Sequence, residues 1–114
     1  MTIPEFKTKL KTTPTAITFK ETMQVIEDHY NFIPTPSTNG AAINSAGTKN
    51  GYCKLFAFAM HQELTKEATL FSFGEYYPTV LEHKNGTSHQ NIRNFMKTGF
   101  KGLSFENEAL TLKK

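Results

Sequence analysis

The chain has 114 residues, of which 38% are hydrophobic and 20% charged. This composition is typical of one globular domain over residues 1–114 and excludes a disordered protein. The formal net charge of +3 comes from twelve lysines and one arginine against ten acidic residues. Because the lysines are spread along the chain and form no basic patch, we expect no nucleic-acid partner.

The single cysteine, Cys53, excludes an internal disulfide and suits a reducing compartment. Every apolar run is far shorter than the roughly 20 residues that a membrane helix needs. The first residues also lack the apolar segment of a secretory signal. We therefore expect a cytoplasmic protein without a membrane partner.

Two amphipathic helices are predicted at the start of the chain. The first begins at Thr2, which forms a capping box with Glu5, and it ends before Pro14. The second begins at Thr18, with the same capping signature toward Glu21. Apolar residues recur at helical spacing in both segments, which predicts one buried face on each helix.

A polar segment follows, from residue 31 to residue 50. Asn31–Thr35 is predicted as a short edge strand, since Pro34 is tolerated at the edge of a sheet. The remainder is rich in Asn, Gly, Ser and Thr, which is typical of turns. Polar loops of this length inside a small domain are often functional.

The third helix, over about residues 51–63, is predicted to be the centre of the fold. Between Tyr52 and Met60, only Lys54 interrupts a run of apolar residues. A helix that is apolar all round is buried all round. We therefore expect the rest of the molecule to surround this helix.

Three shorter helices are predicted beyond it. One follows Thr65 and breaks at Gly74, and another lies around Pro78. The last helix is predicted to be capped by Thr87 with Gln90 as its reciprocal partner, and to stop at residue 99.

Two alternating segments, 102–105 and 109–112, flank Glu106-Asn107 and predict a C-terminal β-hairpin. A hairpin alone is marginal in water, so we expect it to lie on the helices or to pair with the strand at Phe32. The predicted fold class is α+β. It is a helix-rich single domain around a central buried helix, with a small antiparallel sheet that includes the hairpin.

Four blocks of the sequence resemble one known family: NFIPTP (31–36), NGYCKLFAFA (50–59), TLFSFGEYY (69–77) and HQNIRNFMKTGF (89–100). On these blocks the chain is similar to the HopJ type III effector family from about Ile3 to Leu110. The resemblance implies a bacterial, effector-like protein, and it adds secretion by a type III system as an alternative to the cytoplasm. It implies no established activity.

Polar side chains near the start of the third helix and on the last helix form one candidate anion site. Lys54 lies in a first turn, where the helix dipole disfavours a cation by about 0.3–1 kcal/mol. Arg93 is the only guanidinium available for a carboxylate or phosphate, and it lies four residues after His89 on one helical face. The candidate ligand-binding residues are Asn39, Asn44, Asn50, Lys54, His89, Asn91 and Arg93.

Structural explanations stay open for both cations. Lys54 would extend to solvent or pair with a nearby acid. Arg93 would pair with Glu75, Glu82 or Asp28 and stabilise the fold.

A catalytic alternative rests on Cys53, His89 and Asn91, which occur in the chain order of a thiol hydrolase. A thiol at a helix N-terminus is activated, although Cys53 also belongs to a buried apolar stripe. The sequence contains no metal motif, phosphate loop or dinucleotide fingerprint, so we expect no metal and no cofactor. Our leading hypothesis is a non-catalytic binding protein for a small anionic ligand or a protein partner. The alternative is a small hydrolase-like enzyme that uses Cys53 or His89.

Overall fold

Helices make up the larger part of the computed structural model, which describes residues 1–40, 42–47 and 49–113. None of the described helices is both long enough and apolar enough to cross a membrane. In chain order the helical elements are α1 (Ile3–Thr12), the 3₁₀ turn η1 (Pro14–Ala16), α2 (Phe19–His29), α3 (Asn50–His61), α4 (Lys66–Phe71), α5 (Tyr76–Glu82), α6 (Gln90–Thr98) and the 3₁₀ turn η2 (Gly99–Gly102).

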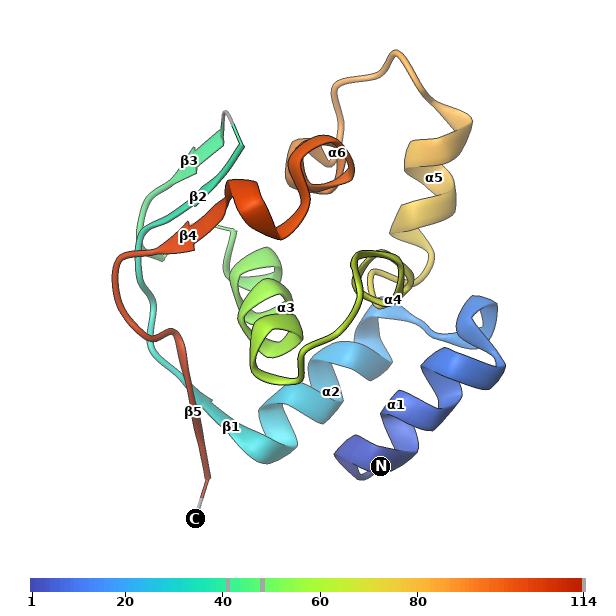
Figure 1. Cartoon of the computed structure of the whole chain (residues 1–114), viewed down its shortest axis with the longest axis vertical. Coiled ribbons are helices and arrows are strands. Elements are labelled where there is room, and N and C mark those ends of the chain that lie inside the picture. Colours follow the sequence, from blue (N-terminus) through green and yellow to red (C-terminus); the bar gives the residue numbers. More distant parts are fainter. Residues whose placement is uncertain (41, 48, 114) are drawn as a thin grey trace.

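Helix α3 lies at the centre, with the other helices on one side and the strands on the other (Figure 1). The central helix predicted over about residues 51–63 is thus confirmed, with its observed bounds at Asn50–His61. Met60 departs from the all-round burial, since 45% of its surface is exposed. The buried side chains of α3 are Cys53, Leu55, Phe56, Ala57, Phe58 and Ala59.

The capping box predicted for α1 is confirmed. The Thr2 backbone N–H donates to the Glu5 carboxylate at 2.8 Å, and the Glu5 N–H donates to the Thr2 hydroxyl at 3.2 Å. Each contact satisfies a backbone donor or fixes a side chain at the free end of the helix. This end of α1 is therefore specified by residues only three apart.

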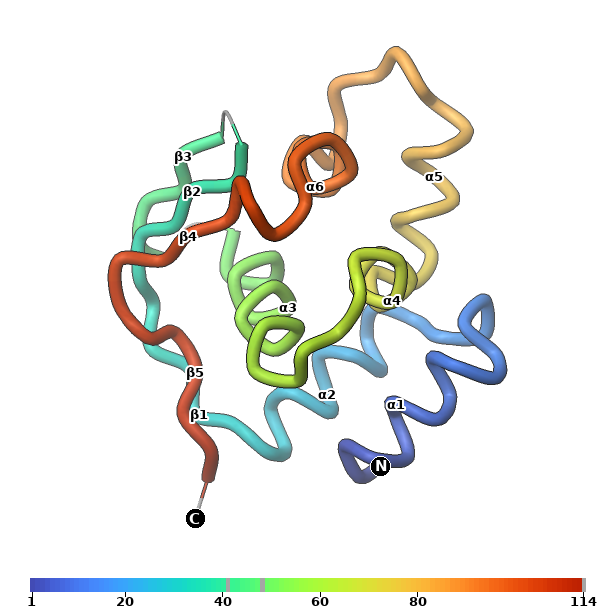
Figure 2. Tube along the Cα trace, in the orientation of Figure 1, coloured from blue at the N-terminus to red at the C-terminus, as the bar shows by residue number. Residues whose placement is uncertain are grey.

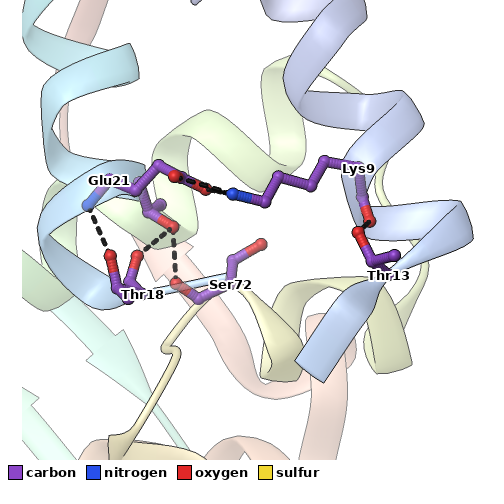
Figure 3. A network of polar contacts seen from close by, with 6 residues as sticks. Lys9, Thr13, Thr18, Glu21 and Ser72 are labelled. Carbon is purple, nitrogen blue, oxygen red and sulfur yellow. Dashed lines mark hydrogen bonds and ion pairs between the residues drawn. The ribbon is translucent and has the colours of Figure 1, made fainter. Parts of the chain in front are cut away.

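The box predicted for α2 is half present. The Glu21 N–H donates to the Thr18 hydroxyl at 3.2 Å, as expected. The Glu21 carboxylate accepts from Lys9 Nζ at 2.8 Å and thus joins α2 to α1 (Figure 3). The Glu21 side chain is turned toward another helix, so it does not reach back to its own cap.

The start of α2 packs against the loop between α4 and α5. The buried Thr22 hydroxyl donates to the Ser72 carbonyl at 2.7 Å, and the Phe19 N–H donates to the Glu75 carboxylate at 3.1 Å. Gly74, between these two contacts, has a φ of 61° and lies directly against the backbone of α2. A residue without a side chain is required there for both reasons.

Short antiparallel strands form two sheets in the described part of the chain. In the larger sheet β2 (Ser37–Asn39) lies between β3 (Ala42–Asn44) and β4 (Leu103–Phe105). In the smaller sheet β1 (Tyr30–Phe32) pairs with β5 (Leu110–Leu112). The α+β class and the antiparallel strands near the C-terminus are therefore confirmed.

The pairing of the two C-terminal strands differs from the expected hairpin. Residues 103–112 run beside residues 30–39 as one ribbon, so β4 and β5 each pair with an earlier strand (Figure 2). Between the sheets, the Asn107 N–H donates to the Thr35 hydroxyl at 3.1 Å. The Asn107 N–H and the backbone donors of β4 and β5 bind residues 30–39. They are therefore not available for a hairpin between β4 and β5. The expected pairing with the strand at Phe32 is confirmed, opposite Leu110.

The cap predicted for the last helix is wrong. The N-cap of α6 is His89, which has a φ of 52° and no side-chain cap, in place of Thr87. The Gln90 amide donates to Asn94 at 3.0 Å, so it is not available as the reciprocal partner. The predicted stop is confirmed, because Gly99, with a φ of 59°, ends the helix.

Gly74→Ala is expected to lower the free energy of unfolding by about 3 kcal/mol, from left-handed backbone strain and overpacking together. A Cβ at this position would lie 2.6 Å from the Thr18 carbonyl carbon. Chemical denaturation measures the loss.

The matched control is Gly47→Ala, where φ is 83° and, apart from the chain neighbours, no atom of the described residues lies within 4 Å of the added Cβ. Strain alone predicts a loss of about 1–2 kcal/mol there. Equal losses in the two variants would contradict the close approach at Gly74.

Candidate anion-binding site

Arg93, near the middle of α6, is enclosed, with 8% of its surface exposed. Its Nε donates to the Ser88 carbonyl at 2.6 Å, and its Nη1 donates to the carbonyls of His83 at 2.7 Å and Lys84 at 3.4 Å. A guanidinium offers several donors in one plane, which suits it to gather carbonyls from a turning loop. Arg93 therefore fastens the loop between α5 and α6, residues 83–89.

The ion-pair partners expected for Arg93 are wrong. The sequence left Glu75, Glu82 and Asp28 open, yet every hydrogen bond of Arg93 in the described chain goes to a backbone carbonyl. Glu75 instead accepts from the N–H of Phe19. Loop carbonyls have no helix or strand partner, so they compete well for a nearby cationic donor.

The third nitrogen of this guanidinium, Nη2, has no such acceptor among the described residues. Arg93 Nη2 is buried and has no hydrogen-bond partner among the described residues. Gly86 lies beside it, and a Cβ on Gly86 would come within 3.0 Å of Nη2. A buried donor without an acceptor costs about 1–3 kcal/mol, so its presence calls for an explanation.

A cleft of about 490 Å³ lies beside Arg93, between α5, the loop and α6. In Figure 1 this loop forms the end of the molecule above α5 and α6. Cationic and apolar side chains line the cleft, and no acidic residue does so within the described chain. The lining residues are Val80, Leu81, Lys84, Gly86, Gln90, Arg93, Met96 and Lys97.

Two of these cations were not among the sequence candidates. Lys84 and Lys97 take part in no ion pair with the described residues. Lys97 lies four residues after Arg93, and this helical spacing is a signal that the sequence did offer. Lys84 is brought to the cleft by the turn after α5, which no periodicity reveals.

Three of the four candidate asparagines, Asn39, Asn44 and Asn91, form a separate cluster. Asn39 Nδ2 donates to the Asn91 backbone carbonyl at 2.7 Å and to its Oδ1 at 3.1 Å, and Asn44 Nδ2 donates to the same Oδ1 at 3.0 Å. These bonds tie β2 and β3 to α6. Asn91 and Arg93 are two residues apart, so they point to opposite sides of the helix. The structure therefore does not bring the asparagines and Arg93 into one pocket.

His89 is also separate from Arg93, because the left-handed backbone at the N-cap redirects its side chain. Its Nδ1 lies 2.8 Å from the Tyr52 hydroxyl, and its ring stacks on Tyr76 with a 5.0 Å centroid separation. Burial, and secondarily the neighbouring Tyr76, raise the pKa of Tyr52. Tyr52 therefore stays a neutral phenol at physiological pH.

Lys54 and Asn50 lie away from the other candidates. The Lys54 ammonium pairs with Glu27 at 3.3 Å and lies 5.1 Å from the ring centre of Phe32. Its structural explanation, pairing with an acid, is therefore present. Asn50 is exposed at the first residue of α3.

Cys53 is buried, with 7% of its surface exposed. Burial raises the pKa of its thiol, and a backbone hydrogen bond from Thr35 offsets only part of that effect. The polar contacts of His89 and Asn91 described above lead to other residues. The three members of the suspected hydrolase set are thus not joined by contacts in the described chain.

Nothing in the described ranges gathers three or more His, Cys, Asp or Glu side chains in an arrangement that could hold a metal ion. The chemistry that this region offers is therefore that of cationic donors and apolar walls.

Arg93→Met is expected to lower the free energy of unfolding by about 3 kcal/mol, because charge-assisted bonds to three carbonyls are lost. Amide exchange across residues 83–88 should become faster. Lys97→Met, one turn later and exposed, is the control, with an expected change within about 0.5 kcal/mol. Similar losses in both variants would contradict the role of Arg93 in holding the loop.

Comparison with known proteins gives a family and a structural relative. The family model described as HopJ type III effector protein matches residues 3–110. The crystal structure of VPA0580, a protein of unknown function, is similar with a TM-score of 0.97 and 49% identity, over 99% of this chain and 95% of that one. No curated protein matches the chain. The match along nearly the whole chain confirms the resemblance found in the sequence, and the chain belongs to the HopJ type III effector family.

Proposed function

We propose that this protein is a non-catalytic binding protein that takes a small anionic ligand in the cleft between α5 and α6. One observation carries the proposal: Arg93 Nη2 is buried without an acceptor in the described chain, beside a cleft of about 490 Å³. Small-molecule sites are commonly clefts of roughly 300–1,000 Å³. An anionic oxygen of a ligand would supply the missing acceptor.

The charge around the cleft supports the same proposal. Lys84, Arg93 and Lys97 lie along its lining, and no carboxylate of the described lining balances them. Like charges in one cleft repel one another and attract a counter-ion. Binding an anion would relieve this repulsion.

The sequence candidates outside the cleft stay predictions. Lys54, His89 and the Asn39–Asn44–Asn91 cluster have protein partners of their own, and Asn50 does not line the cleft. The proposal therefore depends on Arg93 and its two lysine neighbours. A protein partner that presents an acidic side chain would satisfy the same cations. We propose no nucleic-acid or membrane partner.

The second candidate is a small enzyme, and His89 is the observation that favours it. A non-glycine residue with a φ of 52° stores strain of the order of 1–3 kcal/mol, and such residues cluster at functional sites. The 2.8 Å contact with Tyr52 would suit proton transfer. The raised pKa of Cys53 argues against a thiolate nucleophile.

We place this function in the cytoplasm of the producing cell, because an unpaired cysteine suits a reducing compartment. Export by a type III system is the alternative that the family description suggests. Export in an unfolded state would require the complete capping box of α1 to open with the rest of the fold.

The first experiment is a set of thermal melts with benzoate and phenyl phosphate. A ligand at 100 times its dissociation constant adds about 2.7 kcal/mol. For a domain of this size that corresponds to roughly a 10 °C rise in Tm. The double variant Lys84→Met/Lys97→Met should lose the rise.

The control for this experiment is Lys20→Met/Lys101→Met, which removes the same charge at two exposed positions outside the cleft. It should keep the rise. If neither compound raises Tm, or if both double variants respond alike, the cleft is not an anion site.

The second experiment measures the reaction of Cys53 with a thiol reagent at neutral pH. Because the thiol reacts only when the structure opens locally, we expect a rate at least about 100-fold below that of glutathione. The denatured chain should react fully. Labelling of the folded protein as fast as glutathione would favour the enzyme candidate.

A further inference from the structure

We propose, on the basis of the function proposed above, that the ligand of the α5–α6 cleft is an organic phosphate. It would carry a dianionic phosphate monoester on a compact apolar body. The donors that remain free, the charge of the lining and the walls of the cleft each lead to this class.

The guanidinium of Arg93 has no edge with two free donors, so it cannot bind a carboxylate in the usual bidentate way. A carboxylate is bound best by two parallel N–H donors on one edge of the guanidinium. Both edges of Arg93 are partly occupied, because Nε donates to Ser88 and Nη1 to His83 and Lys84. Only Nη2 is left, so Arg93 can offer a ligand a donor from one corner and no bidentate pair.

The remaining donors are single points that surround the cleft. Lys84 approaches from the loop, and Arg93 and Lys97 from two successive turns of α6. An ammonium acts as a compact point charge and binds phosphate readily without a preferred plane. A tetrahedral phosphate presents three oxygens in different directions, so it can meet three such donors at once, whereas a planar carboxylate has two oxygens.

The charge of the lining favours a dianion. Three cationic side chains line the cleft, and the described lining contains no acid. A phosphate monoester carries about −1.5 to −2 charges at pH 7, while a carboxylate carries one. The monoester therefore neutralises more of the repulsion between the three cations.

The apolar walls of the cleft favour a ligand with an apolar body over an inorganic ion. Val80, Leu81 and Met96 form the apolar part of the lining, and 43% of the Leu81 surface is exposed. A cleft of about 490 Å³ is much larger than a phosphate group needs. Burial of an apolar body against these side chains adds affinity that inorganic phosphate would lack.

Gly86 lies against the unpaired Nη2, at the lining of the cleft. Its φ lies outside the left-handed region, so the backbone alone does not require glycine here. The added Cβ of an alanine would lie 3.0 Å from Nη2 and 3.2 Å from the His83 carbonyl. Gly86→Ala should therefore crowd the unpaired donor, while the bond from Arg93 Nε to Ser88 stays in place.

The experiment compares four compounds by isothermal titration calorimetry at one ionic strength: phenyl phosphate, its monoanionic methyl ester, benzoate and inorganic phosphate. The first shares its ring with the second and third and its head group with the fourth. Phenyl phosphate should bind at least about 10-fold more tightly than each of the others.

Variants locate the binding. Lys97→Gln and Gly86→Ala should each weaken phenyl phosphate at least about 5-fold, while Lys101→Gln, an exposed lysine outside the cleft, should not change it. A melt without ligand shows whether Gly86→Ala is folded. Loss of affinity in Lys101→Gln equal to that in Lys97→Gln would overturn the assignment to the cleft.

Each remaining outcome has a distinct meaning. Benzoate or the methyl ester binding as tightly as phenyl phosphate overturns the dianionic phosphate but keeps the proposed anion site. Inorganic phosphate binding as tightly overturns the apolar body. No binding by any compound overturns the proposed function itself.

A soluble phosphate monoester and a phosphorylated lipid head group share this chemistry, and vesicles separate the two sources. Co-sedimentation with phosphatidylcholine vesicles that contain phosphatidic acid, lost in Lys97→Gln, would identify the lipid. Binding of phenyl phosphate without co-sedimentation would identify the soluble ligand. Either result supports the organic phosphate, and the lipid result would overturn our proposal that the protein has no membrane partner.

Discussion

The burial of most of α3 is the constraint on which the rest of this structure depends. Phe58 contacts Phe6 from α1 and Tyr30 from β1, while Phe56 contacts Phe73 and Phe95 from the other direction. Each fully buried aromatic side chain contributes about 1.5–3 kcal/mol. A helix that is buried along most of its surface must be enclosed by elements from the whole chain, and this explains why short helices and three-residue strands suffice around it.

The same constraint explains which parts of the fold could be predicted. The Thr2–Glu5 cap and the apolar run of α3 are local signals, and both appear as expected. The pairing of β4 and β5 is not local. The strand at Phe32 was among the expected partners, whereas nothing in Leu103–Phe105 indicates its pairing with β2. The prediction of Thr87 as the cap of α6 was wrong for a related reason. His89 contacts Tyr52 and Tyr76, and the sequence of residues 87–90 alone cannot predict these contacts.

The candidate site was likewise predictable only in the part that depends on local sequence. Sequence reasoning selected Arg93 because it is the only arginine, and the structure places that residue beside a cleft with an unused donor. Its backbone partners could not be predicted, since the path of the loop through His83 and Ser88 sets them. The single expected site became separate clusters, because residues two apart on α6 face opposite ways and Lys54 is paired with Glu27.

The ribbon made by residues 30–39 and 103–112 has a consequence for how this chain reaches its folded state. Phe32 lies opposite Leu110, so the chain must be synthesised as far as Leu110 before that pair can form. Contacts between residues so distant in sequence form slowly, because the chain loses conformational entropy before any contact compensates for the loss. On the ribosome, the helices and the local pair of β2 with β3 can therefore form before β4 and β5 are available to pair with β2 and β1.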